Sequence, residues 1–159
     1  MADTLTKAER SALMSRIRGT HTKPEVLVRS ALHRAGFRFR LYARGLPGRP
    51  DIVLPKHRVV IFVHGCFWHR HGCPLSSEPA TRRAFWTAKF DANIARDARN
   101  TRALRRLGWR VLTIWECSLR TKASRERAMA SLQRKISRVR ASEVSSAAAA
   151  GVRETRRGR

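Results

Sequence analysis

Cysteine and histidine residues gather in one short segment, HGCFWHRHGC, at residues 64–73. Here Cys66, His71 and Cys73 offer two thiolates and an imidazole, and Cys117 supplies a fourth ligand. Four sulfur and nitrogen ligands are typical of a closed, structural zinc site that leaves no position for a reactive water. The alternative is that the thiols are buried as small hydrophobic groups. Because this set uses all three cysteines of the chain, we expect zinc.

Two histidines of the same segment, His64 and His69, are left over if His71 binds zinc. Histidine titrates near neutral pH, so either one could take a proton from an attacking water or assist the leaving oxygen in phosphodiester hydrolysis. The alternative is a histidine that lies beside the zinc ligands or at the surface. The residues alone leave both interpretations open.

Asp51 follows Pro50 in a chain with few acidic residues. Carboxylate, carbonyl and water oxygens suit magnesium, and phosphodiester cleavage needs a cation to neutralise the charge that builds on the phosphate. A Pro-Asp pair by itself is more typical of a turn. Asp51 as a magnesium ligand therefore needs further support.

Phe67 and Trp68 are adjacent large aromatic residues in a short, polar loop. Exposed aromatic side chains on a metal-bound loop suggest insertion between DNA bases, and unstacking costs least at a mismatch. Trp86 either joins them or belongs to the core. Trp109 and Trp115 lie on a predicted strand, where we expect core packing.

The net charge is strongly positive, since 35 basic residues oppose 11 acidic ones and give +24. A coding bias explains an excess of arginine over lysine but not an excess of positive charge. We therefore expect a nucleic acid partner, bound through its phosphates in a salt-dependent and sequence-independent way.

The length of 159 residues fits one domain. No segment approaches the roughly 18 uninterrupted apolar residues of a membrane span. The first ten residues, MADTLTKAER, lack the basic and apolar regions of a secretory signal. We expect a protein of the reducing cytoplasm, without disulfides and without a membrane partner.

Periodicity and turn residues predict the secondary structure. Two Thr-x-x-Glu patterns, at residues 6–9 and 22–25, each fit the capping box of a helix. The first helix continues through Leu13, Met14 and Ile17, and Gly36 ends the second. The remaining elements are a half-buried strand at 37–42, a hairpin of strands at 51–54 and 58–63 with the second fully buried, a helix at 81–107, a strand at 109–115, and a basic helix with Met129, Leu132, Ile136 and Val139 on one side. This order predicts an α/β fold with a mixed central sheet flanked by helices.

Four blocks of the sequence resemble the very short patch repair (Vsr) endonucleases. They are PGRPD at 47–51, VIFVHGCFWHRHGC at 60–73, PATRRAFW at 79–86 and LGWRVLTIWEC at 107–117. The resemblance covers residues 8–140. It implies a restriction-endonuclease-like fold and a magnesium-dependent enzyme that nicks DNA beside the thymine of T:G mismatches, which arise when 5-methylcytosine deaminates. It implies an endonuclease domain at 1–140 with an N-terminal helical arm, and we expect a disordered basic tail at 141–159.

The resemblance also assigns residues. Asp51 and the backbone carbonyl of Val63 would bind magnesium, and His69 would act as general base. His64, Glu25 and Asp97 would support the active site. The zinc ligands would be Cys66, His71, Cys73 and Cys117, and the intercalating side chains Phe67, Trp68 and Trp86. We expect a prokaryotic monomer that acts at the nucleoid on double-stranded DNA, together with other mismatch-repair proteins.

Two positions depart from the family pattern. Val63 stands where threonine is usual, but a backbone carbonyl contact tolerates valine, and Arg70 stands where histidine is common. Glu25 also fits the third position of its capping box, which gives it a purely structural alternative. Two other functions remain open: a zinc-stabilised DNA-binding module without catalysis, and a related nuclease with a different DNA specificity.

Overall fold

The computed structural model describes residues 6, 8–9, 12 and 19–154, with side chains up to residue 138. The first predicted capping box is present, because the Thr6 backbone N–H and hydroxyl both donate to the Glu9 carboxylate, at 2.8 and 2.7 Å. The Glu9 N–H donates back to Thr6 at 3.3 Å. The apolar positions Leu13, Met14 and Ile17 lie outside the described residues.

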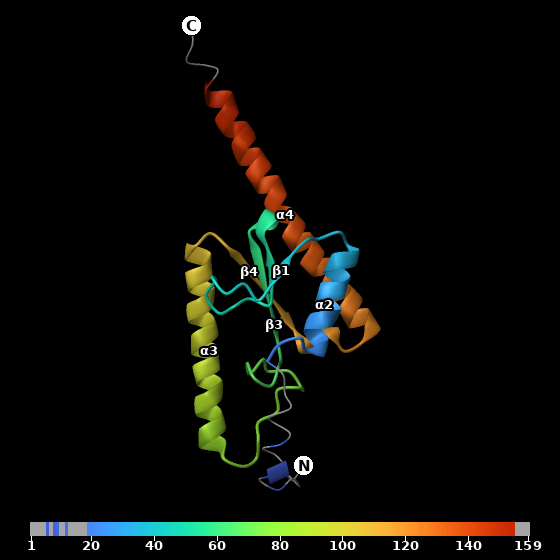
Figure 1. Ribbon diagram of the computed structural model, residues 1–159, viewed down its shortest axis with the longest axis vertical. Coiled ribbons are helices and arrows are strands. Elements are labelled where there is room, and N and C mark those ends of the chain that lie inside the picture. The colour runs from blue at the N-terminus through green and yellow to red at the C-terminus, as the bar shows by residue number, and fades with distance from the viewer. Residues whose placement is uncertain (1–5, 7, 10–11, 13–18, 155–159) are drawn as a thin grey trace.

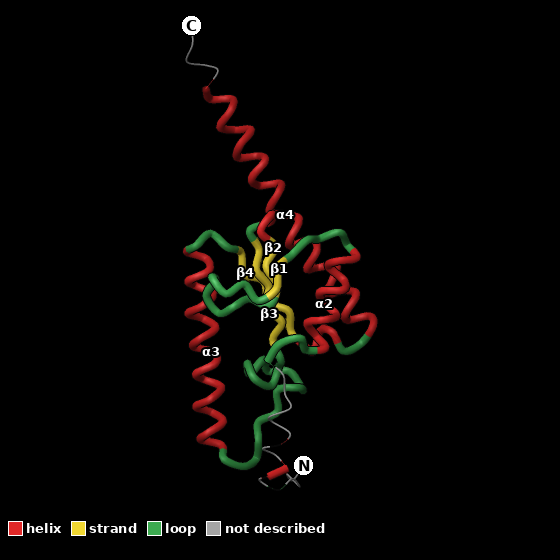
Figure 2. Tube along the Cα trace, viewed as in Figure 1, coloured by secondary structure: helices red, strands yellow, loops and turns green. Residues whose placement is uncertain are grey.

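The fold is a four-stranded mixed sheet flanked by helices (Figures 1 and 2). The elements are α2 Lys23–Arg34, β1 Arg40–Leu41, β2 Ile52–Leu54, the short 3-10 helix η1 Pro55–His57, β3 Val59–His64, α3 Arg83–Arg106, β4 Arg110–Trp115, the 3-10 helix η2 Glu116–Leu119, and α4 Lys122–Glu154. The strand order is β1-β2-β3-β4; β1, β2 and β3 pair antiparallel, and β3 pairs parallel with β4. The predicted α/β architecture is confirmed.

Alternating residues of the central strands divide the core into two layers. Ile52 and Ile61 pack on the face covered by α2 and α4, whereas Val53 and Val60 pack with Leu104 of α3 on the other face. Figure 1 shows the same arrangement, with α3 on one side of the sheet and α2 and α4 on the other. Within the described part of the chain, no helix is long and apolar enough to cross a membrane.

The predicted hairpin is confirmed, and a strand lies within the range expected at 37–42 but is shorter than predicted. Only Arg40–Leu41 pairs with β2, and both residues are exposed. Phe37 and Phe39 instead pack against the core from the segment before β1. A period-2 pattern indicates only that alternate side chains are buried. An extended segment at the sheet edge can bury alternate side chains without pairing as a strand. The second hairpin strand is fully buried only over 59–61.

The last helix buries Met129, Leu132 and Ile136 as predicted. Val139 lies beyond the described side chains. The backbone of α4 stays helical to Glu154, so no helix end coincides with the boundary predicted at residue 141.

The pairing of β2, β3 and β4 brings the predicted active-site and metal-binding residues to one end of the sheet. In the parallel pair β3 and β4, His64 lies opposite Trp115, so the segments that leave both strands start side by side. Because β2 runs antiparallel to β3 and Ile52 pairs with Ile61, the residue before β2, Asp51, lies beside the end of β3. Asp51 and the end of β3 therefore lie close together.

Gly48 provides a stability prediction for the loop that leads to Asp51. Its φ is +72°, and an added Cβ would lie 2.7 Å from the Asn100 amide nitrogen. We expect Gly48→Ala to lower the free energy of unfolding by about 1–2 kcal/mol, because alanine disfavours this φ and Asn100 must move. Chemical denaturation measures the effect. Gly45→Ala is the matched control, since nothing lies within 4 Å of its Cβ position; an equal loss in both variants would contradict the proposed clash.

Candidate active site and metal cluster

A cleft of about 870 Å³ opens at the end of the sheet where β3 ends and β2 begins. Its walls come from the N-terminus of α2, the segment before β2, the end of β3, the loop that follows, and one face of α3. All of the residues predicted for the active site line it: Glu25, Asp51, Val63, His64, His69 and Asp97. Residues that are distant in sequence are therefore gathered around one space.

Asp51 is held at the cleft by the backbone of β3. Its carboxylate accepts a hydrogen bond of 2.7 Å from the Val63 N–H. Burial raises the pKa of Asp51 to about 6, although this hydrogen bond and the nearby Arg29 act in the opposite direction. A carboxylate that is this poorly solvated gains much from a cation ligand.

His64 and His69 stack on each other with ring centroids 3.8 Å apart. His69 Nδ1 contacts the Asp97 carboxylate at 2.5 Å, which fixes the ring and turns its other nitrogen away from Asp97. Burial and the neighbouring His69 lower the pKa of His64 to about 4, so His64 is neutral at physiological pH. Burial alone would raise the pKa of Asp97, but the hydrogen bond with His69 and the charges of the nearby basic groups together outweigh burial, so the pKa is lowered.

Glu25 is only 3% exposed and is surrounded by donors. The Thr22 hydroxyl donates to it at 2.9 Å and the His21 N–H at 3.1 Å. Arg29 donates at 2.5 Å, and the Tyr42 hydroxyl also donates. The Glu25 N–H donates back to the Thr22 hydroxyl at 3.4 Å, so the N-cap half of the predicted capping box is confirmed. The Glu25 carboxylate accepts from the His21 N–H instead of the Thr22 N–H, and it also lines the cleft. Structural support therefore accounts for its hydrogen bonds, and a catalytic role stays a prediction.

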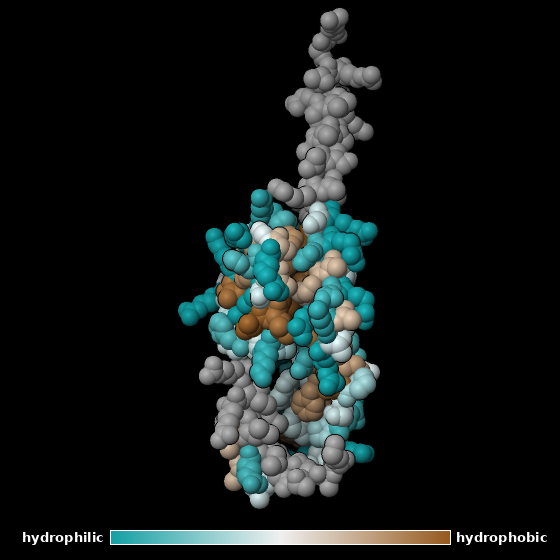
Figure 3. Space-filling view, turned by 90° about the vertical axis from the view of Figure 1, so that its right-hand side faces the viewer, coloured by the Kyte–Doolittle hydropathy of each residue, from teal (hydrophilic) through white to brown (hydrophobic). Residues whose placement is uncertain are grey.

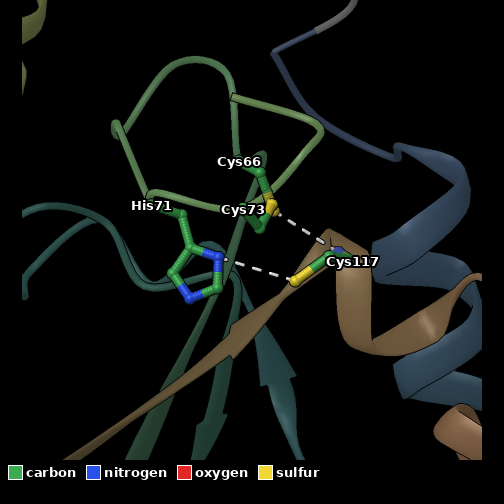
Figure 4. A group of neighbouring side chains, drawn as sticks. All are labelled: Cys66, His71, Cys73 and Cys117. Carbon is green, nitrogen blue, oxygen red and sulfur yellow. Dashed lines mark hydrogen bonds between the residues drawn. The ribbon is translucent and has the colours of Figure 1, made fainter. Parts of the chain in front are cut away.

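The ligand atoms of Cys66, His71, Cys73 and Cys117 all lie within 4.8 Å of one another (Figure 4). Cys117 Sγ is 3.5 Å from His71 Nδ1, and its backbone N–H is 3.4 Å from Cys66 Sγ. The β3–β4 register explains this, because Cys66 and Cys117 each follow a paired position by two residues. Burial raises the pKa of Cys66 to about 12, and a hydrogen bond with His71 lowers the pKa of Cys73 to about 6. Three sulfurs and one imidazole in this arrangement fit a tetrahedral metal ion, so the cluster can hold one.

Trp115 lies between the metal cluster and the cleft. Its ring stacks on His71 at 4.1 Å and meets the edges of His64 at 5.3 Å and His69 at 6.3 Å. The predicted core role fits Trp109, which packs against the α3 side of the sheet, but Trp115 is half-buried among histidines instead. It gives the metal cluster a direct packing contact with the cleft.

The chain is similar to known proteins over most of its length. The sequence profile described as DNA mismatch endonuclease Vsr matches residues 2–75. The DNA mismatch endonuclease Vsr of Escherichia coli is 49% identical over 120 residues, which are 76% of this chain and 77% of that protein. The chain belongs to the Vsr family of DNA mismatch endonucleases.

Two further relatives are nicking enzymes of bacteria. A type II nicking enzyme of Xanthomonas oryzae is 50% identical over 119 residues, 75% of this chain and 88% of the relative. A type II nicking enzyme of Neisseria meningitidis is 43% identical over 123 residues, 77% of this chain and 88% of the relative. The resemblance to the Vsr family is thus confirmed, and with it the interpretation of the chain as an endonuclease.

The aromatic residues predicted to enter DNA form one cluster in this Vsr family member. Phe67 contacts Trp68 at 5.0 Å and Trp86 at 5.5 Å, with all three half-buried, and Phe67 also meets the buried Phe90 at 5.2 Å. Phe85, which was not predicted, is 47% exposed beside Trp86. The aromatic cluster is thus anchored on the first turns of α3.

Sequence analysis missed most of the polar residues that α3 contributes to the cleft of this Vsr endonuclease. They are Lys89, Asn93, Arg96, Asn100 and Thr101, and they recur with helical spacing on the face that also carries Asp97. Glu116 and Tyr42 were missed as well. Polar residues on a helix normally indicate a solvent-exposed face. The only signal in the sequence that these residues line a site was that they share a helix face with Asp97.

Proposed function

We propose that this Vsr-family endonuclease nicks one strand of duplex DNA beside the thymine of T:G mismatches that arise from deamination of 5-methylcytosine, and so initiates very short patch repair. The observation that carries the proposal is the set of Asp51, His64, and the His69–Asp97 pair around one cleft. The names of the relatives, a mismatch endonuclease and nicking enzymes, support the same reaction.

A magnesium ion bound by the Asp51 carboxylate and the Val63 carbonyl would neutralise charge on the scissile phosphate. The residues fit such an ion, because the Val63 N–H fixes the Asp51 carboxylate and burial deprives it of water. Valine at position 63 still offers its backbone oxygen. The side chain supplies no ligand.

His69 is proposed to accept a proton from the attacking water. Its Nδ1–H donates to Asp97, so Nε2 carries the lone pair that a general base needs. Asp97 would act as a positioning residue that also stabilises the protonated ring. His64 stacks on His69 and, being neutral, would not repel the positive charge that His69 gains.

Zinc in the Cys66, His71, Cys73 and Cys117 cluster would serve as a scaffold. It would hold the loop that carries Phe67 and Trp68, which with Trp86 would enter the duplex next to the mismatch. Selectivity would follow because a mismatched base pair is cheaper to unstack than a matched one.

The decisive experiment compares strand nicking of a T:G duplex with that of the matched duplex and of other mismatches, with magnesium present. We expect nicking beside the thymine of T:G, and loss of about 100-fold or more in His69→Ala, because a general base contributes about 10²–10⁴-fold. Binding without nicking by the wild type would favour the DNA-binding module. Equal nicking of matched duplexes would favour a nuclease of different specificity.

Asp97→Asn tests the positioning role separately. The amide cannot stabilise a protonated His69, so we expect the single-turnover nicking rate to fall about 100-fold while the affinity for T:G DNA changes less than about threefold. Electrophoretic mobility shift without magnesium measures the affinity. Asp91→Asn, on the exposed side of the same helix, is the control; a parallel loss of affinity in Asp97→Asn would argue against the role.

The remaining proposals concern context. We propose action on the nucleoid in a prokaryotic cytoplasm, as a monomer and together with other mismatch-repair proteins. Size-exclusion chromatography with light scattering tests the monomer. Nicking assays with and without purified repair proteins test whether those proteins alter the rate.

A further inference from the structure

The end of the sheet opposite the cleft carries a second concentration of positive charge. Six basic side chains from η1, the adjoining start of β3, the end of α3, β4 and α4 lie there, and we call them the basic end: Lys56, Arg58, Arg106, Arg110, Lys135 and Arg138. All are exposed except Arg110, which is half-buried. In the side view, hydrophilic side chains surround this end of the molecule (Figure 3).

Hydrogen bonds and ring stacking join the elements of the basic end. The Arg58 guanidinium donates to the Leu107 carbonyl at 2.7 Å and stacks 4.7 Å from the Trp109 ring. The Arg58 carbonyl accepts from the Arg110 N–H at 2.8 Å, and the Arg110 guanidinium donates to the Lys135 carbonyl at 3.1 Å. Arg58 is therefore held in place with donors to spare, which lowers the entropy that a bound phosphate would cost.

Acidic side chains are absent from the basic end, as far as side chains are described. Glu25, Asp51, Asp97 and Glu116 line the cleft, and Glu78 and Asp91 pair with Arg70 on the metal loop. Two further acidic side chains are described: Glu9 bonds with Thr6, and Glu126 lies near the start of α4. Among the side chains that are described, none opposes the positive charge of this end, unlike that of the cleft.

The basic end is too far from the cleft to serve the same phosphates. The six residues of β3 separate Arg58 from the loop at the cleft, and a strand of that length spans roughly 17 Å. Lys56 lies in η1, just before β3, and the Lys135 carbonyl accepts from Arg110 at the start of β4, so both residues lie at the opposite end of the sheet from that loop. A straight duplex seated in the cleft would leave these side chains without a partner.

We propose that the basic end binds the phosphate backbone of a second DNA segment while the first occupies the cleft. The proposal rests on the proposed function only in taking the cleft as the site of the mismatched duplex. Regularly spaced phosphates match a spread of fixed cations without base contacts, so binding would be sequence-independent and salt-sensitive. An enzyme holding two segments could transfer between them in its search for a mismatch.

The test measures energy transfer between a donor-labelled T:G duplex and an acceptor-labelled matched duplex, without magnesium. We expect the wild type to bring both together. The combined variant Lys56→Gln, Arg106→Gln and Lys135→Gln should weaken second-duplex binding at least about tenfold, and lower its salt slope by about 0.9 for each phosphate that the protein no longer neutralises. Its single-turnover nicking of a short T:G duplex should equal that of the wild type.

The matched control is Arg120→Gln, Lys122→Gln and Arg127→Gln, which removes the same charge from exposed positions at the end of η2 and in the first turns of α4. An equal loss in both triple variants would overturn the proposal in favour of net charge alone. Binding of only one duplex by the wild type would also overturn it, as would tighter binding of duplex RNA than of DNA at the second site. Failure of the proposed function would give a different result: the wild-type protein would bring the two duplexes together but would not nick either one.

Discussion

Replacing Asp51 by asparagine is expected to abolish nicking and, at the same time, to stabilise the protein in the absence of magnesium. Asparagine keeps an oxygen for the Val63 N–H but loses the charge that binds a cation. We expect the nicking rate to fall at least about 1000-fold, which corresponds to about 4 kcal/mol of transition-state stabilisation.

The gain in stability follows from the burial of the carboxylate. The pKa of Asp51 is raised to about 6 in the folded protein, so folding favours the protonated carboxyl group. The resulting contribution to the free energy of unfolding is fully present below the usual pKa near 4, and it is lost as the pH rises through 6. At pH 8 the variant should therefore be more stable than the wild type by about 2–3 kcal/mol, and at pH 3 the difference should vanish.

Urea unfolding at both pH values, without added magnesium, measures the difference. Asp91→Asn serves as control, because its exposed carboxylate pairs with Arg70 at 3.6 Å and its loss should bring no stability and no change in nicking. Nicking by Asp51→Asn at more than a tenth of the wild-type rate would remove Asp51 as the magnesium ligand.

Cys117→Ala should produce the largest loss of stability. The variant leaves three ligands of the metal cluster on one loop and none on the η2 side of the sheet. We expect loss of bound zinc, a decrease of about 3–5 kcal/mol in the free energy of unfolding, and a Tm lower by roughly 10 °C. Nicking should fall with it, since the loop also carries His69.

The measurements are zinc content by mass spectrometry of the metal and thermal unfolding by circular dichroism. Ser118→Ala is the neighbouring control, because its hydroxyl only donates to the Trp115 carbonyl at 2.6 Å and takes no part in the cluster. A Cys117→Ala protein that keeps one zinc per chain and its Tm would refute the zinc assignment.

Sequence reasoning found the metal cluster because cysteine is rare in this chain and all three fall in one set. It did not supply the contact that brings Cys117 to the loop, since that depends on the parallel pairing of β3 with β4. Strand order arises from packing between distant segments. No local sequence pattern around Trp115 predicts that its ring contacts the His64 ring.

The active-site residues were assigned through the family resemblance rather than from spacing. Asp51 alone looked like a turn residue, and the structure adds what the sequence lacked: its burial and the Val63 hydrogen bond. The polar face of α3 escaped notice because Asn93 and Asn100 look like solvent-exposed residues until the sheet places them beside the cleft.

The parallel pairing of β3 and β4 also has a consequence for synthesis on the ribosome. All of α3 is translated between Cys73 and Cys117, so a nascent chain can present at most three of the four cluster ligands until β4 has emerged. The same strand places Trp115 against His64 and His69. The four cluster ligands can therefore come together only after β4 has been translated.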